Sequence, residues 1–103
     1  FAPMKGGKYL QEEINKYVPG GKFTICDDWH FGGFGKHTAE LVAFMNQFYR
    51  ENNIPLDMVY TAKMMYGLQA RILAGEYDKA SKILCLHTGG LQGNVSIKEK
   101  LIY

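Results

Sequence analysis

The chain has 103 residues, of which 47% are hydrophobic, 14% are aromatic and 21% are charged, with a formal net charge of +2. This composition is typical of one globular domain, and so small a charge with no basic run argues against nucleic acid or an anionic membrane as a partner. No apolar stretch reaches the roughly 18 residues of a membrane span and residues 1–20 lack a secretory layout, so we expect a cytoplasmic protein.

Three helices are predicted from apolar residues that recur at helical spacing. The first covers Lys8–Tyr17 and ends at the breakers Val18-Pro19-Gly20-Gly21. The second covers Thr38–Asn53, with Thr38 as its N-cap, and the third covers Thr61–Leu73. The apolar stripes of the second and third helices consist of Leu41, Phe44, Met45, Phe48 and Tyr49, and of Met64, Met65, Leu68 and Ile72.

Three short apolar segments between the helices predict strands: KFTIC (22–26), LDMVY (56–60) and KILCLH (82–87). The last is apolar on both faces, which is typical of a buried parallel strand. Helices and strands that alternate along a chain favour an α/β fold, here three αβα layers around a mostly parallel sheet. Because so small a sheet leaves its edges open, we expect residues 1–103 to form part of a larger α/β domain, or else to complete the sheet by association.

The glycine-rich loop FGGFGKHT (31–38) follows a predicted strand and precedes a predicted helix, as a phosphate-binding P-loop does. The P-loop pattern needs glycine where His30 stands, and serine or threonine where His37 stands. The position that would reach magnesium is one of those that differ. We therefore reject a P-loop at this place.

Neither a metal site nor a disulfide is expected. The polar residues of the loop after the first predicted strand lack the spacing of a metal-binding motif, and glycines around them give no fixed geometry. Cys26 and Cys85 each lie in an apolar segment, which favours reduced, buried thiols in a cytosolic protein. The loop residues considered as metal ligands are Asp27, Asp28, His30 and His37.

Two polar groups stand at the ends of predicted strands, where ligands bind in open α/β sheets. Thr88-Gly89-Gly90 follows the last strand, and its glycines let the backbone approach a ligand, although a plain turn would also explain them. Tyr60-Thr61 ends another, and Thr61 is also a suitable N-cap for the third helix. If both groups lie at the same edge of the predicted sheet, they would suit a flat heteroaromatic cofactor. Three methionines nearby are expected to fill the core instead: Met58, Met64 and Met65.

LDMVYTAKMMYGL (56–68) and ILCLHTGG (83–90) resemble the D-cysteine desulfhydrase and 1-aminocyclopropane-1-carboxylate deaminase family. KGGKYLQEEI (5–14) and DDWHFGGFGK (27–36) are similar to other segments of that family. The resemblance implies the fold of pyridoxal-phosphate enzymes of the tryptophan-synthase-β type, fold type II. It also implies that this chain is the C-terminal third of the enzyme and belongs to its large domain.

The resemblance implies roles for the two polar groups. Tyr60 is expected to be catalytic, close to the substrate and to the ring of the cofactor, pyridoxal 5'-phosphate. Thr61 and Thr88 would supply hydroxyls near the ring nitrogen and the substrate, and the sequence leaves open which of them meets the nitrogen. Gly89 and Gly90 would leave room for the ring. The implied partners are a small amino-acid substrate, the N-terminal part of the same protein and a second copy in a homodimer.

The residue at Thr61 bears on the reaction. Cyclopropane-opening members of the family usually have glutamate at this place, and a carboxylate there keeps the ring nitrogen protonated and the cofactor a strong electron sink. A neutral hydroxyl suits the loss of a good leaving group. The resemblance therefore implies conversion of D-cysteine to pyruvate, ammonia and sulfide, with conversion of 1-aminocyclopropane-1-carboxylate to 2-oxobutanoate and ammonia as the alternative.

Several positions depart from the family pattern. Met58 replaces the usual proline, Ala62 replaces the usual glycine, and Leu91-Gln92-Gly93 differs from the usual continuation. The family's Schiff-base lysine and phosphate loop have no counterpart here, since neither Lys36 nor Lys63 stands at that lysine's position. We therefore expect the chain alone to be inactive. Two other interpretations are a non-catalytic α/β interaction module and a flavodoxin-like nucleotide binder, and the latter lacks a phosphate loop.

Overall fold

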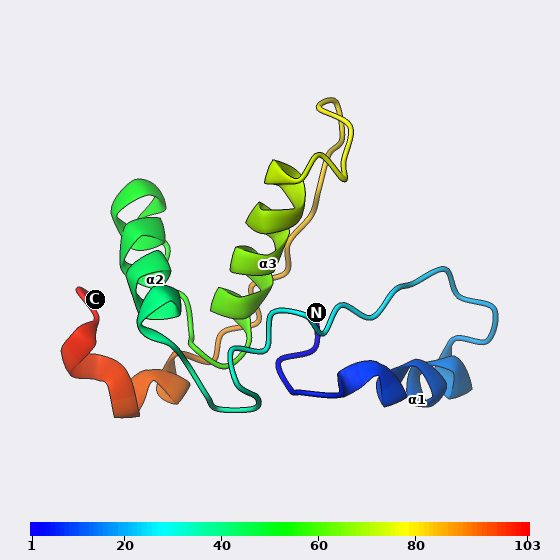
Figure 1. Cartoon of the computed structure of the whole chain (residues 1–103), viewed down its shortest axis with the longest axis horizontal. Coiled ribbons are helices and arrows are strands. Elements are labelled where there is room, and N and C mark those ends of the chain that lie inside the picture. The colour runs from blue at the N-terminus through cyan, green and yellow to red at the C-terminus, as the bar shows by residue number, and fades with distance from the viewer.

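The computed structural model describes all 103 residues and consists of helices joined by coil (Figure 1). Helices α2 and α3 pack on each other. In the view of Figure 1, η2 lies at the lower left, below α2, and α1 lies at the lower right, away from both helices. No helix is long and apolar enough to cross a membrane. In chain order, with η for a 3-10 helix, the elements are η1 (Gly7–Tyr9), α1 (Leu10–Tyr17), α2 (Ala39–Asn52), α3 (Thr61–Leu73) and η2 (Leu91–Lys100).

The three predicted helices are confirmed. The first begins as η1 and continues as α1, and the third has the predicted bounds. Thr38 caps α2 as predicted, since its hydroxyl accepts a hydrogen bond from Leu41 N at 3.2 Å. At the other end of α2, Asn53 adopts the left-handed conformation, with a φ of 55°, which a short polar side chain tolerates at a helix end.

No strand forms, so the predicted parallel sheet and three-layer αβα fold are wrong for this chain. Residues 22–26 and 82–87 are coil, and Leu84 in the second segment is 86% exposed. A strand persists only where its N–H and C=O groups pair along its length with a neighbour. Residues 22–26 make one such bond to a distant segment, from Ala2 N to Cys26 O at 2.7 Å. The apolar pattern was present, but the pairing partner was not.

The remaining predicted strand, residues 56–60, is instead a turn that leads into α3. Its first three residues are buried, and the backbone closes on itself through a hydrogen bond of 2.9 Å from Ala62 N to Asp57 O. This segment therefore belongs to the start of a helix. Its polar residue, Asp57, is buried together with Leu56 and Met58.

A small core lies between α2, α3, the 56–58 turn and η2. Leu41 and Met45 are fully buried, as the predicted stripe of α2 requires, and Met58 fills the core as expected. The predicted stripe of α3 holds only in part, since Leu68 is buried but Ile72 is 48% exposed. The buried residues of the core are Leu41, Val42, Met45, Leu56, Met58, Ala62 and Ile97.

The N-terminal segment packs against α3 at Gly67. A Cβ at this glycine would lie 2.6 Å from Phe1 Cε1 and 2.9 Å from the Trp29 ring, which is closer than real Cβ contacts come. The rings of Phe1 and Trp29 themselves lie 6.0 Å apart. The bare backbone of Gly67 thus lets two aromatic residues from distant parts of the chain reach the helix. In contrast, α1 buries none of its residues, and its Tyr17 is 83% exposed.

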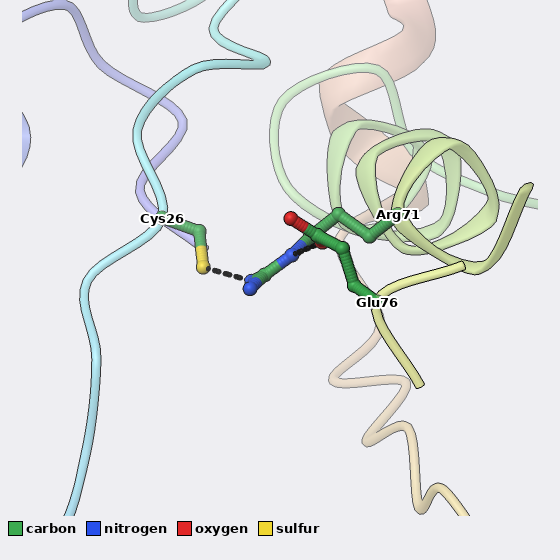
Figure 2. A network of polar contacts seen from close by, with 3 residues as sticks. All are labelled: Cys26, Arg71 and Glu76. Atoms are coloured by element: carbon green, nitrogen blue, oxygen red, sulfur yellow. Dashed lines mark hydrogen bonds and ion pairs between the residues drawn. The ribbon is translucent and has the colours of Figure 1, made fainter. Parts of the chain in front are cut away.

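A polar contact joins residues 22–26 to the end of α3 (Figure 2). Arg71 Nη1 donates a hydrogen bond to Cys26 Sγ at 2.7 Å, and Arg71 Nε pairs with the carboxylate of Glu76. The bond to Glu76 raises the pKa of Arg71, so its guanidinium stays charged. Cys26 and Cys85 are both free thiols and both partly buried.

Candidate functional site

A buried carboxylate, that of Asp57, organises the start of α3. Its Oδ1 accepts hydrogen bonds from Val59 N at 2.9 Å and Tyr60 N at 2.7 Å. Its Oδ2 accepts another from Thr61 N at 2.9 Å. The first N–H groups of a helix have no partner within the helix, and a negative charge near them is favourable. Asp57 therefore satisfies three backbone donors and fixes the turn that carries Tyr60 and Thr61.

Thr61 is held by the same aspartate. Its hydroxyl donates to Asp57 Oδ2 at 2.6 Å and accepts from Asp57 N at 2.9 Å, and the residue is 2% exposed. The interpretation of Thr61 as the N-cap of the third helix is wrong. Thr61 is the first residue of α3, and the N-cap position belongs to Tyr60, whose side chain makes no capping bond. The capping hydrogen bonds come instead from the carboxylate of Asp57, four residues before Thr61, which accepts from Tyr60 N and Thr61 N.

The segment before η2 lies against the segment before α3. His87 Nε2 is 2.8 Å from Pro55 O. Asn94 is buried and bonds two residues of the turn: its Nδ2 donates to Leu56 O at 2.8 Å, and its Oδ1 accepts from Met58 N at 2.8 Å. These contacts bring the two sequence blocks that carry the predicted site residues next to each other.

The two glycines at this junction differ in their surroundings. Both have positive φ, +87° for Gly89 and +94° for Gly90, a conformation that favours glycine. A Cβ at Gly90 would lie 3.1 Å from Asp57 Cγ, whereas a Cβ at Gly89 would meet nothing within 4 Å. Gly90 thus packs against the Asp57 carboxylate, while Gly89 leaves open space beside it. Thr88, which precedes them, is exposed.

Tyr60 is the accessible side chain of the α3 start. It is 49% exposed, and its ring meets that of Phe34 edge to face, with 6.0 Å between the ring centroids. Phe34 comes from the glycine-rich loop that precedes α2. Of the five predicted site residues, Tyr60 and Thr88 thus offer hydroxyls to solvent, and the hydroxyl of Thr61 is buried. Gly90 lies next to the Asp57 carboxylate, and a Cβ at Gly89 would meet no atom within 4 Å.

Curated proteins with related sequences come from archaea and bacteria. The chain is 39% identical over 75 residues to "Putative 1-aminocyclopropane-1-carboxylate deaminase" of Pyrococcus horikoshii, which is 73% of this chain and 22% of that protein. It is 36% identical over 67 residues to D-cysteine desulfhydrase of Klebsiella pneumoniae, which is 65% of this chain and 20% of that protein. It is 32% identical over 81 residues to D-cysteine desulfhydrase of Yersinia pestis, which is 79% of this chain and 24% of that protein. By sequence, the chain is similar to a stretch of these deaminases and desulfhydrases.

The chain spans 20% to 24% of the length of these curated relatives. No family model matches the chain. No solved structure matches it either. The similarity therefore rests on the curated relatives alone, and they carry the names of the family that the two sequence blocks at 56–68 and 83–90 resemble.

The structure adds a buried lysine to the residues around the turn. Lys63 is 1% exposed, and its Nζ donates to the backbone oxygens of His30 at 2.7 Å, Gly33 at 2.8 Å and Pro3 at 3.2 Å. Burial lowers the pKa of Lys63, and the negative charge of Asp57 partly offsets that effect. An amine engaged by three carbonyls is not free to attack a carbonyl compound.

Asp57, Lys63 and Asn94 had no functional role in the sequence analysis. Asp57 had a readable signal, a lone carboxylate in an apolar run just before a predicted helix, which is a capping position one turn early. Lys63 and Asn94 had none, because their acceptors lie 30 or more residues away in the chain. The loop residues considered as metal ligands, and all other His, Cys, Asp and Glu residues, form no group of three that could hold a metal ion.

Proposed function

We propose that this chain is part of a pyridoxal-phosphate-dependent enzyme that converts D-cysteine to pyruvate, ammonia and sulfide. The observation that carries the proposal is the contact between the two sequence blocks, in which Gly90 packs on the Asp57 carboxylate that fixes Tyr60 and Thr61. The names of the curated relatives, deaminase and desulfhydrase, support a reaction of this class.

The residues at the junction fit one edge of a flat ring. Tyr60 and Thr88 offer exposed hydroxyls, and Gly89 offers bare backbone beside open space. The phosphate of the cofactor needs donors elsewhere, because Asp57 already occupies the free N–H groups at the start of α3. We therefore assign the phosphate site and the covalent lysine to residues of the enzyme that this chain does not span.

Each hydroxyl has a proposed task. When bound, the cofactor supplies an electron sink for the bond-breaking at the substrate's α-carbon. Tyr60 bonds the substrate and moves a proton on it, and the edge contact with Phe34 keeps the phenol ring in place. Thr88 contacts the cofactor ring. Thr61 acts indirectly, through Asp57, because its hydroxyl is already hydrogen-bonded to that residue.

The choice of D-cysteine follows from the charge at this edge. The carboxylate at the junction, that of Asp57, is buried and bonded to three N–H groups and one hydroxyl. It is thus unable to meet the cofactor ring, which faces neutral hydroxyls. A weaker electron sink suits the elimination of sulfide, a good leaving group.

A paired assay tests the proposal in the full-length protein supplied with pyridoxal phosphate. Sulfide and pyruvate are measured with D-cysteine as substrate, and 2-oxobutanoate is measured with 1-aminocyclopropane-1-carboxylate. We expect a higher kcat/KM for D-cysteine, and L-cysteine serves as the stereochemical control. Absence of both activities would contradict the proposed function.

A second candidate, 1-aminocyclopropane-1-carboxylate deaminase, is supported by the relatives with that name. The Pyrococcus horikoshii and Pyrococcus furiosus proteins are 39% and 36% identical over 75 residues, while the Yersinia pestis desulfhydrase is 32% identical over 81 residues. Faster formation of 2-oxobutanoate than of sulfide in the paired assay would establish this reaction instead.

A further inference from the structure

Lys63 is a buried cation whose nearest partners are carbonyl oxygens. Its Nζ bonds Pro3 O, His30 O and Gly33 O, and its side chain is 1% exposed. Taking an ammonium group out of water costs several kcal/mol unless its donors are satisfied. Three backbone carbonyl oxygens satisfy the donors of this ammonium group, so Lys63 holds two distant segments, one at Pro3 and one at residues 30–33, against α3.

Two of these oxygens, those of His30 and Gly33, belong to residues 30–36, the part of the glycine-rich stretch before α2 that we call the 30–36 loop. The loop closes through hydrogen bonds of 3.1 Å from Gly33 N to His30 O and from Lys36 N to Gly33 O. Gly33 has a φ of +124° and is buried, a conformation that residues with a Cβ rarely adopt. This backbone shape turns the oxygens of His30 and Gly33 toward the same ammonium group.

The loop also carries the residue that contacts Tyr60. Phe34 follows Gly33 directly, and its ring meets the Tyr60 ring edge to face at 6.0 Å. Lys63 stands three residues after Tyr60 at the start of α3, a spacing that puts both side chains on one side of the helix. The loop is therefore attached to α3 by a polar contact at Lys63 and an aromatic contact at Tyr60. A second aromatic contact is made by the Phe31 ring, which meets the Tyr66 ring edge to face with 4.9 Å between centroids.

We propose that Lys63 is a positioning residue for Tyr60: its ammonium holds the 30–36 loop on α3, so that Phe34 fixes the orientation of the Tyr60 ring. The inference rests on the proposed function, in which Tyr60 acts on the substrate. Phe34 itself is 58% exposed, so its own packing holds it weakly. The bonds from Lys63 fix the backbone of Gly33, the residue directly before it.

The kinetic test uses Lys63→Met in the full-length enzyme, with Lys36→Met as the matched control, because Lys36 is an exposed lysine of the same loop. Loss of alignment at a reacting group can cost roughly 100-fold in rate. We expect Lys63→Met to lower kcat by about that factor with little change in KM, and Lys36→Met to leave both unchanged. An unchanged kcat in Lys63→Met would overturn the proposal.

Two further variants keep the kinetic test decisive. Phe34→Ala leaves the three carbonyl bonds intact and should lower kcat as Lys63→Met does, and the double variant should lose no more than either single one. Additive losses would mean that Lys63 acts elsewhere. If Lys63→Met fails to fold, Lys63→Ala is assayed with added propylammonium, which can donate to the three carbonyls, and with tetramethylammonium, which cannot. Equal activity with the two cations would contradict the proposal.

A spectroscopic test separates this inference from the proposed function. The full-length protein is labelled with 3-fluorotyrosine, and the Tyr60 resonance is assigned by its loss in Tyr60→Phe. We expect Lys63→Met to move this resonance to the position it takes in Phe34→Ala, with Lys36→Met as the unshifted control. A Tyr60 signal that stays in place would overturn the positioning role. An enzyme that lacks both activities but shows the shift would overturn only the proposed function.

Discussion

Asp57 and the Thr61 hydroxyl bind each other through two hydrogen bonds of opposite direction. The Thr61 hydroxyl donates to Asp57 Oδ2 at 2.6 Å, and the oxygen of this hydroxyl accepts from Asp57 N at 2.9 Å. Both residues are buried. Because the other carboxylate bonds of Asp57 hold Val59 N, Tyr60 N and Thr61 N, this pair sets the shape of the turn that presents Tyr60.

Removing the Thr61 hydroxyl should destabilise the protein. Thr61→Val keeps the shape of the side chain but takes a hydrogen bond from a buried carboxylate, and bonds to charged groups are worth roughly 1.5–3 kcal/mol. We expect a loss of that size in the free energy of unfolding, measured with urea. Thr61→Ser retains the hydroxyl and is the control. A Thr61→Val protein as stable as the wild type would show that the bond contributes nothing.

The two glycines of the junction allow a matched comparison. Gly89→Ala and Gly90→Ala both force alanine into positive φ, which costs about 1–2 kcal/mol. Only Gly90→Ala also pushes a methyl group against the Asp57 carboxylate, and overpacking of this kind costs roughly 1–3 kcal/mol more. Urea unfolding should therefore rank Gly90→Ala as the less stable variant. Equal losses would mean that Gly90 does not contact Asp57.

Tyr103 should make stability depend on alkaline pH. Its hydroxyl donates to Leu56 O at 2.7 Å and accepts from Leu56 N at 3.3 Å. Burial raises the pKa of Tyr103 above the usual 10.0, an effect that the bond to Leu56 partly offsets and the charge of Asp57 increases. The folded state thus favours the neutral phenol, so this stabilisation is complete below pH 10.0 and is lost as the pH rises through the raised pKa.

The phenylalanine variant isolates this effect. Tyr103→Phe has no phenol to ionise, so its unfolding free energy should fall less than that of the wild type when the pH is raised past the usual tyrosine pKa. The measurement is urea unfolding on either side of that pH. Parallel pH profiles for the two proteins would rule out a titrating Tyr103.

The helices could be predicted because their signals are local. The stripe of α2 and the hydroxyl of Thr38 act within a few residues, and Leu41, Met45 and Thr38 lie as predicted. The strands could not, because a strand depends on a partner that the pattern does not reveal. Leu84 lies in an apolar run, yet no segment pairs with that run, and the side chain is exposed.

The site could be predicted only in outline. The two blocks were expected to share one place, and Asn94 and Gly90 bring them together. The residues that hold the place together were missed, because their partners are distant in sequence. Lys63 is three residues from Tyr60, but its role appears only when the oxygens of His30 and Gly33 are seen around its ammonium group.

The measurement that tests the central claim most directly is the turnover of Tyr60→Phe in the full-length protein. Tyr17→Phe is the control, since Tyr17 is 83% exposed on α1, away from the site. If Tyr60 moves a proton on the substrate, kcat should fall roughly 10²- to 10⁴-fold, with the affinity for pyridoxal phosphate nearly unchanged. Unchanged turnover of both D-cysteine and 1-aminocyclopropane-1-carboxylate would contradict the account.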